Sequence, residues 1–197
     1  MESNEKKLSP EESLSLIQAM IATAKNKVSE NGFHLLLWGV LVISCCLINY
    51  LFIKMNLGNW AGIVWLIMPF IGVPAGSLYE RGRKEKGLVK THYDIHISYM
   101  WLSYLFSLIV VIVFCSFSQI SAVPFILIIT GMVTFATGKI IQFTPLLIGG
   151  VIFWLSALVC IEIKSEEQLL IQAGSILIGY IVPGVLLWRK SKATQYV

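Results

Sequence analysis

The sequence predicts an all-α protein, a polytopic membrane helical bundle with six transmembrane helices plus an N-terminal amphipathic helix. Of the 197 residues, 56% are apolar and 13% are charged, whereas about a quarter of the residues in a soluble domain are charged. The apolar residues gather in six runs, each of which approaches or reaches the roughly 20 residues that cross a bilayer. The runs do not alternate apolar and polar residues, which argues against a membrane β-barrel.

The six runs divide the chain into one membrane domain and two tails. We expect the membrane domain to cover residues 32–190 and residues 191–197 to form a cytoplasmic tail. The predicted transmembrane helices are 33–53, 60–79, 96–117, 122–138, 144–161 and 169–188. Pro74 and Pro183 predict kinks in the second and the sixth of them.

Residues 1–31 are predicted to form a cytoplasmic tail and an amphipathic interfacial helix. The segment SPEE at 9–12 is typical of a helix start with a capping box, and Gly32 predicts the helix end. Apolar residues between Leu14 and Val28 share one face that lysines border, as in helices that lie in the membrane interface. The alternative is that this face packs on a partner helix or on the protein's own cytoplasmic side.

Lysine and arginine predict the orientation, because they are more abundant in cytoplasmic loops. With a cytoplasmic N-terminus, Lys54 and Lys164 fall on the outer side. The other thirteen fall on the inner side: Lys6, Lys7, Lys25, Lys27, Arg81, Arg83, Lys84, Lys86, Lys90, Lys139, Arg189, Lys190 and Lys192. We therefore expect both termini in the cytoplasm.

The central stretches of the six predicted helices contain no Asp, Glu, Lys, Arg or His. Proton-coupled transporters, many pumps and voltage sensors use ionisable groups there, so these classes are disfavoured. The chain also has no Walker A motif, G-x-S-x-G motif or dinucleotide-binding fingerprint. We therefore expect a non-enzymatic protein without catalytic residues or a cofactor. The cysteines lie in apolar runs and are expected to be packing residues rather than disulfides: Cys45, Cys46, Cys115 and Cys160.

His92 and His96 are the best candidates for a metal site. They are four residues apart and share a helix face if the third membrane helix begins early enough, a spacing that can ligate a transition metal. The alternative is an ordinary interfacial helix start, where Asp94 complements the helix dipole and the imidazoles meet lipid headgroups.

Five basic residues lie between the second and the third predicted membrane helix and could bind anionic lipid headgroups, at about 1 kcal/mol per charge. The alternative is that they serve as a topology determinant. These residues are Arg81, Arg83, Lys84, Lys86 and Lys90.

Small residues recur within the predicted membrane helices, where they allow helix backbones to approach closely. Packing within one chain is the expected use, with a homo-oligomer interface as the alternative. The positions singled out are Gly72, Gly76, Thr134, Gly149, Gly150, Ser175 and Gly179.

Several short motifs resemble a known group of sequences. They are TFATGKIIQFTPLLIGG at 134–150, EESL at 11–14, Gly32-Phe33 and LWG at 37–39. With them the chain resembles an uncharacterised family of six-helix inner-membrane proteins of Bacteroidetes-type bacteria. The resemblance implies a multi-pass protein of the bacterial inner (plasma) membrane. That family has no established activity, so no functional residue is implied.

Three functional hypotheses follow from the sequence. The first is an integral membrane protein that acts through helix packing with itself or with a membrane protein partner. The second is a small transporter or permease subunit for a neutral or apolar solute, which needs a polar cavity near residues such as Asn49, Thr130 and Thr134. The third is a lipid-modifying membrane enzyme that uses His92, Asp94 and His96 at the level of the lipid headgroups. Nucleic acid is not an expected partner, because the basic residues lie in short segments rather than across a folded face.

Overall fold

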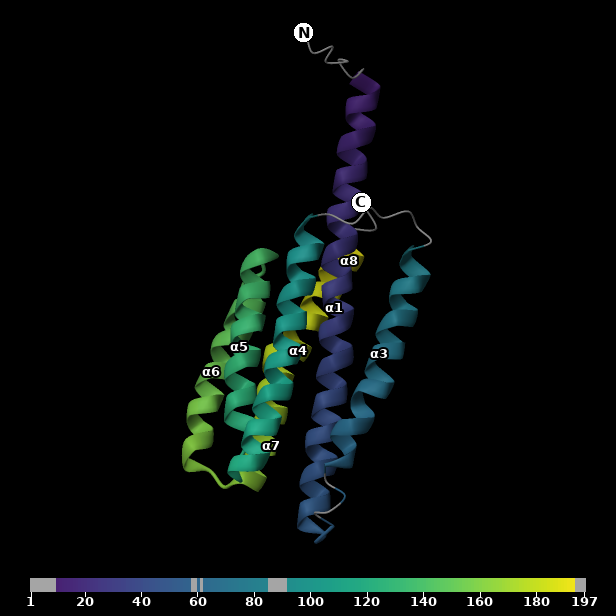
Figure 1. Ribbon diagram of the computed structural model, residues 1–197. Coiled ribbons are helices and arrows are strands. Elements are labelled where there is room, and N and C mark those ends of the chain that lie inside the picture. Colours follow the sequence, from purple (N-terminus) through teal and green to yellow (C-terminus); the bar gives the residue numbers. More distant parts are fainter. Residues whose placement is uncertain (1–9, 58–59, 61, 85–91, 194–197) are drawn as a thin grey trace, which may run out of the picture.

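The computed structural model describes the backbone of residues 10–57, 60, 62–84 and 92–193, and the side chains of 32–57, 60, 62–79, 81 and 97–189. Every regular element within these ranges is helical, as Figure 1 shows. In chain order the elements are α1 (Pro10–Lys54), α3 (Ile63–Lys84), α4 (His92–Ser118), α5 (Val123–Ile140), α6 (Thr144–Val159), the 3-10 turn η1 (Cys160–Glu162), α7 (Ser165–Ile176), the π-helical turn η2 (Leu177–Ile181) and α8 (Val182–Ala193).

The described helices are long and apolar enough for a multi-pass membrane protein. Five segments meet the length and composition of a membrane span: Gly32–Lys54, Ile97–Ser118, Val123–Ile140, Thr144–Glu162 and Ser165–Arg189. The sixth apolar helix, Ile63–Tyr79 within α3, is shorter. The described part of the chain therefore contains five to six helices that could cross a bilayer.

α1 passes through Gly32 without a break, so the predicted helix end at Gly32 is wrong. Gly32 lies against α8, where an added Cβ atom would be 3.2 Å from both the Gly184 carbonyl oxygen and the Leu187 Cβ. The glycine allows two helices to approach closely and does not end one. Figure 1 shows α1 extending beyond the ends of the other helices. The side chains of 10–31 lie outside the described ones, so their contact with the membrane interface stays a prediction.

The last apolar segment consists of α7, η2 and α8 in direct succession, with a π-helical turn just before Pro183. Proline has no N–H to bond the Gly179 carbonyl four residues earlier, and its ring crowds that carbonyl. The chain widens to a π turn, in which the Val182 N–H donates to the Leu177 carbonyl. π turns inside helices are frequent at functional sites, and this one places Gly179 and Tyr180 in the core.

The elements form a packed part and two flanking helices. The packed part consists of α1, α5, α6 and the α7–η2–α8 segment, and it contains the large fully buried side chains Leu127, Leu146, Phe153 and Leu187. Among the described elements, the backbone of α3 approaches α1 and that of α4 approaches α5 (Figure 1). The two flanking helices therefore each rest on one neighbour.

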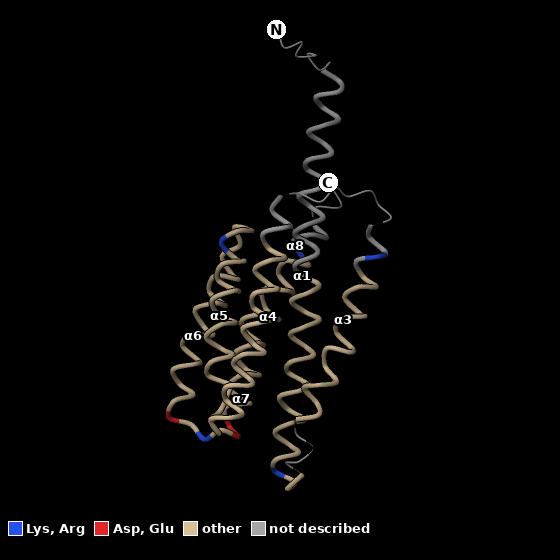
Figure 2. Tube along the Cα trace, viewed as in Figure 1, with Lys and Arg blue, Asp and Glu red and all other residues tan. Residues whose placement is uncertain are grey.

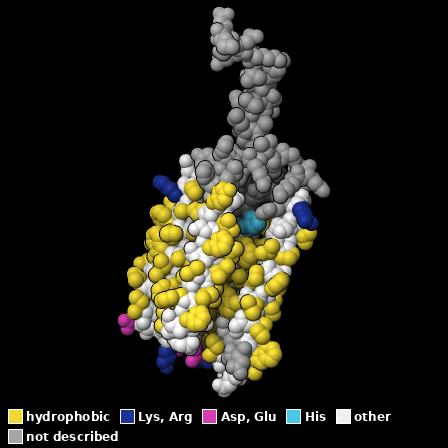
Figure 3. All heavy atoms as spheres, viewed as in Figure 1, with side chains coloured by type: hydrophobic (Ala, Val, Ile, Leu, Met, Phe, Trp, Pro, Cys, Tyr) yellow, Lys and Arg dark blue, Asp and Glu magenta, His cyan; other side chains and the backbone are white. Residues whose placement is uncertain are grey.

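The described charged side chains lie at the two ends of the bundle, as Figure 2 shows. Lys139 lies in the last turn of α5, and Arg81 and Arg189 lie in the last parts of α3 and α8, which end on the same side of the bundle. At the other end Lys54, in the last turn of α1, forms an ion pair with Glu166, and Lys164, Glu162 and Glu167 are close to Glu166 in the sequence. Figure 3 shows apolar side chains covering the face between the ends. This division into two charged ends and an apolar middle is what a bilayer requires of the protein surface.

Candidate functional site

A seam of glycines joins α5, α6 and η2. An added Cβ atom at Gly149 would be 2.7 Å from the Gly179 carbonyl oxygen and 3.0 Å from the Gly179 Cα. An added Cβ atom at Gly150 would be 2.9 Å from the Gly131 carbonyl oxygen, and one at Gly179 would be 2.7 Å from the Phe153 ring. Three predicted packing positions, Gly149, Gly150 and Gly179, therefore meet at one seam where backbones touch directly.

Two pairs of hydroxyl groups lie inside the bundle beside this seam. A hydrogen bond of 2.9 Å joins the hydroxyls of Tyr104 in α4 and Thr130 in α5. One turn along α5, Thr134 Oγ1 donates to the Thr130 carbonyl at 2.6 Å and lies 3.1 Å from Tyr180 Oη. Thr130 and Thr134, considered above as the lining of a polar cavity, are instead buried and hydrogen-bonded to protein groups.

Gln168 ties three segments together at the glutamate-bearing end of the bundle. Its Nε2 donates to the carbonyls of Cys160 at 2.8 Å and Ile163 at 2.9 Å, and its Oε1 accepts from Ser121 Oγ at 2.5 Å. The side chain thereby links η1, α7 and the turn before α5. Gln168 is not among the residues predicted from the sequence, although a glutamine beside a predicted span is a signal for such a link.

Two buried amide groups stand out because their oxygens have no partner. Asn49 Oδ1 in α1 and Gln172 Oε1 in α7 are buried without a hydrogen bond to the described part of the chain. The two helices run antiparallel, since Gly39 lies against Ile181 and an ion pair of 2.9 Å joins Lys54 to Glu166. This register places Asn49 and Gln172 at neighbouring levels of the bundle.

α3 is held to α1 by close contacts concentrated in one half of its length. An added Cβ atom at Gly72 would be 2.9 Å from the Trp38 ring, and one at Gly76 would be 3.4 Å from the His34 ring. Both are predicted packing positions, and both face α1. At Gly72 and Gly76 the nearest atoms of α1 belong to side chains, whereas at Gly149 the nearest atoms belong to the backbone of Gly179. The backbones of α1 and α3 are therefore farther apart than the backbones that meet at the seam.

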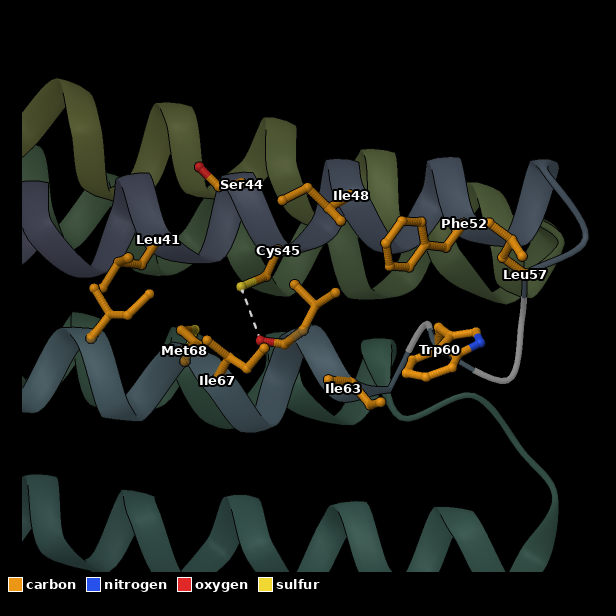
Figure 4. Close-up of a pocket in the computed structure, with 12 residues that line it drawn as sticks. Leu41, Ser44, Cys45, Ile48, Phe52, Leu57, Trp60, Ile63, Ile67 and Met68 are labelled. Carbon is orange, nitrogen blue, oxygen red and sulfur yellow. Dashed lines mark hydrogen bonds between the residues drawn. The ribbon is translucent and has the colours of Figure 1, made fainter.

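Beyond Gly72, α1 and α3 enclose an apolar groove of about 720 Å³, shown in Figure 4. Side chains from both helices line it, among them Leu41, Ile48, Phe52, Ile67 and Met68. This groove therefore lies between two helices at the side of the bundle.

The remaining predicted site residues are less informative. Ser175 is buried and donates to the Ile171 carbonyl of its own helix at 2.6 Å, and Arg81 is exposed near the end of α3. Among the described residues, no group of three or more His, Cys, Asp or Glu could hold a metal ion. The other predicted lipid and metal residues lie outside the described side chains: Arg83, Lys84, Lys86, Lys90, His92 and His96.

No family model matches the chain, and no curated protein and no solved structure matches it either. The family resemblance drawn from the motifs therefore stays a prediction.

Proposed function

We propose that this chain is a non-enzymatic, multi-pass protein of the bacterial inner membrane that works as a homodimer through the outer face of α4. The observation that carries the proposal is the position of α4, whose backbone approaches α5 among the described elements. Only 6% of its most apolar window is buried inside one chain. Within one chain, most of the surface of α4 is uncovered. A helix from a second copy could pack on this uncovered face.

The outer face of α4 also carries hydroxyl groups within the apolar span Ile97–Ser118. Tyr99 and Ser103 are exposed on the same stripe as Phe106, Val110 and Phe117. A serine hydroxyl that faces lipid tails can bond only to its own helix, as Ser107 does to the Ser103 carbonyl, whereas hydroxyl groups between two helices can also bond across the interface. In a twofold dimer the same stripe meets itself, so each copy supplies hydroxyls and rings at matching depth.

Cross-linking tests the dimer directly. The four native cysteines are free and buried, so a cysteine introduced by Ser103→Cys is the accessible thiol. Oxidation of membranes should give a disulfide-linked dimer with Ser103→Cys, because twofold symmetry brings the two residues near the axis. Leu158→Cys on the exposed face of α6 is the control and should stay monomeric. A monomeric mass for the native chain in nanodiscs, together with no Ser103→Cys dimer, would refute the proposal.

We further propose that both termini are cytoplasmic. The end of the bundle with Arg81, Lys139 and Arg189 is purely basic among the described side chains, whereas the opposite end carries Lys54 and Lys164 with three glutamates. The basic end is the expected cytoplasmic one. Reporter fusions after residue 197 and within 162–164 test this: activity of a cytoplasmic reporter at 162–164 but not at 197 contradicts it.

The transporter hypothesis has less support. It needs a polar path through the middle of the bundle, and Thr130 and Thr134 are bonded there beside the buried rings of Phe153 and Tyr180. This packing favours a role that depends on contacts between helices.

A further inference from the structure

α1 leaves the bundle as an unbroken continuation of its apolar span. The helix runs from Pro10 to Lys54, and the span begins at Gly32. Figure 1 shows the first part of α1 extending past the ends of the other described helices. An amphipathic helix that lies in the membrane interface has to turn where it meets the bilayer. α1 continues through Gly32 without such a turn.

The apolar positions of this extension reach too far from the span for a helix in the interface. At the helical rise, Val28 is about 6 Å and Leu14 about 27 Å beyond Gly32. A tilt of about 40° still leaves Leu14 about 20 Å out. The headgroup layer on one side of a bilayer is only about 5–7 Å thick. The unbroken helix therefore carries most of these positions past the headgroups.

Within the extension, apolar residues follow the spacing of a coiled coil. Successive separations of three, four, three and four residues match the a and d positions of a heptad, which a second helix covers. In an unbroken helix such positions form one narrow stripe along the axis. The stripe positions, placed by the backbone and the sequence spacing, are Leu14, Ile17, Ile21, Ala24 and Val28.

The positions beside the stripe fit a parallel pair of identical helices. Copies inserted into the membrane with the same orientation hold α1 parallel and at the same height, so each stripe position meets its own counterpart. In that register the g position of one copy pairs with the next e position of the other. Met20 is then paired with Lys25, and Lys27 with Gly32. The parallel register thus sets neither lysine against another lysine.

We propose that residues 14–28 of α1 form a parallel two-stranded coiled coil with the same residues of a second copy. The proposal rests on the proposed function for its partner, a second copy of this chain, but it uses α1 and not α4. The stripe covers little more than two heptads, and helices this short are marginal in water. A copy held in the same membrane has a high effective concentration, which favours it over a partner free in solution.

Disulfide formation at single introduced cysteines in the full chain tests the coiled coil. Identical stripe positions are the closest residues of the two helices, and a disulfide bridges Cα atoms about 6 Å apart. Oxidation of membranes should give a dimer with Ile21→Cys at a several-fold higher yield than with Ala19→Cys, the matched control at the f position away from the stripe. The unsubstituted chain should give no dimer, because its four cysteines are buried.

A lysine placed in the stripe gives the second readout. Ile17→Lys combined with Ile21→Cys should lower the dimer yield several-fold, because it sets like charges opposite each other, whereas Ser15→Lys outside the stripe should not. Equal yields at Ile21→Cys and Ala19→Cys, or a yield that Ile17→Lys does not lower, overturn the proposal. A dimer with Ser103→Cys but not with Ile21→Cys overturns only the coiled coil and is expected if the stripe lies on the membrane surface. The reverse result supports the coiled coil and rejects only the α4 interface.

Discussion

The seam between α5, α6 and η2 differs sharply from the flanking helix α4, although both consist of apolar residues. In Ser165–Arg189, 50% of the most apolar window is buried, against 6% in Ile97–Ser118. Yet Ile97–Ser118 has the higher mean hydropathy. Apolarity therefore does not decide which helix is packed, because lipid tails solvate leucine as well as a neighbouring helix does.

Small residues account for the difference. α5 and α6 each contain two glycines, and these meet backbone atoms of the facing helix at the seam. α4 contains no glycine or alanine and is tied to α5 through the Tyr104–Thr130 hydrogen bond. In this protein, close packing thus depends on backbone contact and buried polar links rather than on hydrophobic burial.

The largest predicted effect comes from adding one methyl group to the seam. Gly149→Ala should destabilise the protein by roughly 2–3 kcal/mol, because the new Cβ meets backbone atoms that cannot rotate away. Gly174→Ala is the control, since Gly174 has no atom within 4 Å, and it should stabilise by about 0.5–1 kcal/mol through helix propensity. Denaturation in mixed detergent micelles measures both values. Equal effects of the two substitutions would mean that the seam is not closely packed.

The second largest effect is expected from replacing Gln168, whose side-chain amide is hydrogen-bonded, and it is compared with replacing Gln172, whose amide oxygen has no partner. Gln168→Leu should cost roughly 2 kcal/mol, because it removes the side-chain donor to the Cys160 and Ile163 carbonyls and the acceptor of the Ser121 hydroxyl. Gln172→Leu should be neutral or stabilising, because the Gln172 oxygen has no partner to lose. The same denaturation assay compares the two variants. A large loss with Gln172→Leu instead indicates that this amide holds a bound water or ligand.

The sequence predicts the helices well but not their pairing. Runs of apolar residues indicate where the long apolar helices lie, because a helix that could cross a bilayer needs about 20 such residues. Gly149 and Gly179 were each expected to pack, but which glycine faces which depends on helix register and rotation, and these are set by the whole bundle. The prediction for Gly32 failed for the same reason. Glycine commonly ends a helix in a soluble protein, but here Gly32 lies inside α1 and allows α8 to pack closely against it.

The groove could not be predicted for a related reason. Its lining residues, such as Ile48 and Ile67, have the same composition as any lipid-facing surface. The space is present because α1 and α3 make no close contact beyond Gly72. No residue type in the sequence indicates where two helices will not be in contact. The Gln168 links likewise join Ser121 and Cys160, which are far apart in the sequence.

The third effect tests the polar link at the seam. Thr134→Val removes the hydrogen bond to Tyr180 while it keeps the shape of the side chain, and the Tyr180 hydroxyl then loses a partner. We expect a loss of about 1 kcal/mol. Thr137→Val is the matched control, because the Thr137 hydroxyl donates within its own helix to the Val133 carbonyl. Similar stabilities of the two variants would show that the Tyr180 link contributes little.

The smallest effect is expected where glycine meets side chains rather than backbone. At Gly72 an added Cβ approaches the Trp38 ring and Leu41 Cδ1 at 2.9 and 3.0 Å, and both groups can shift towards the groove. Gly72→Ala should therefore change the stability by less than about 1 kcal/mol, since helix propensity offsets part of the crowding. A loss as large as that of Gly149→Ala would mean that α3 is packed as rigidly as the seam. In that case only α4, and not α3, would differ from the seam in how closely it is packed.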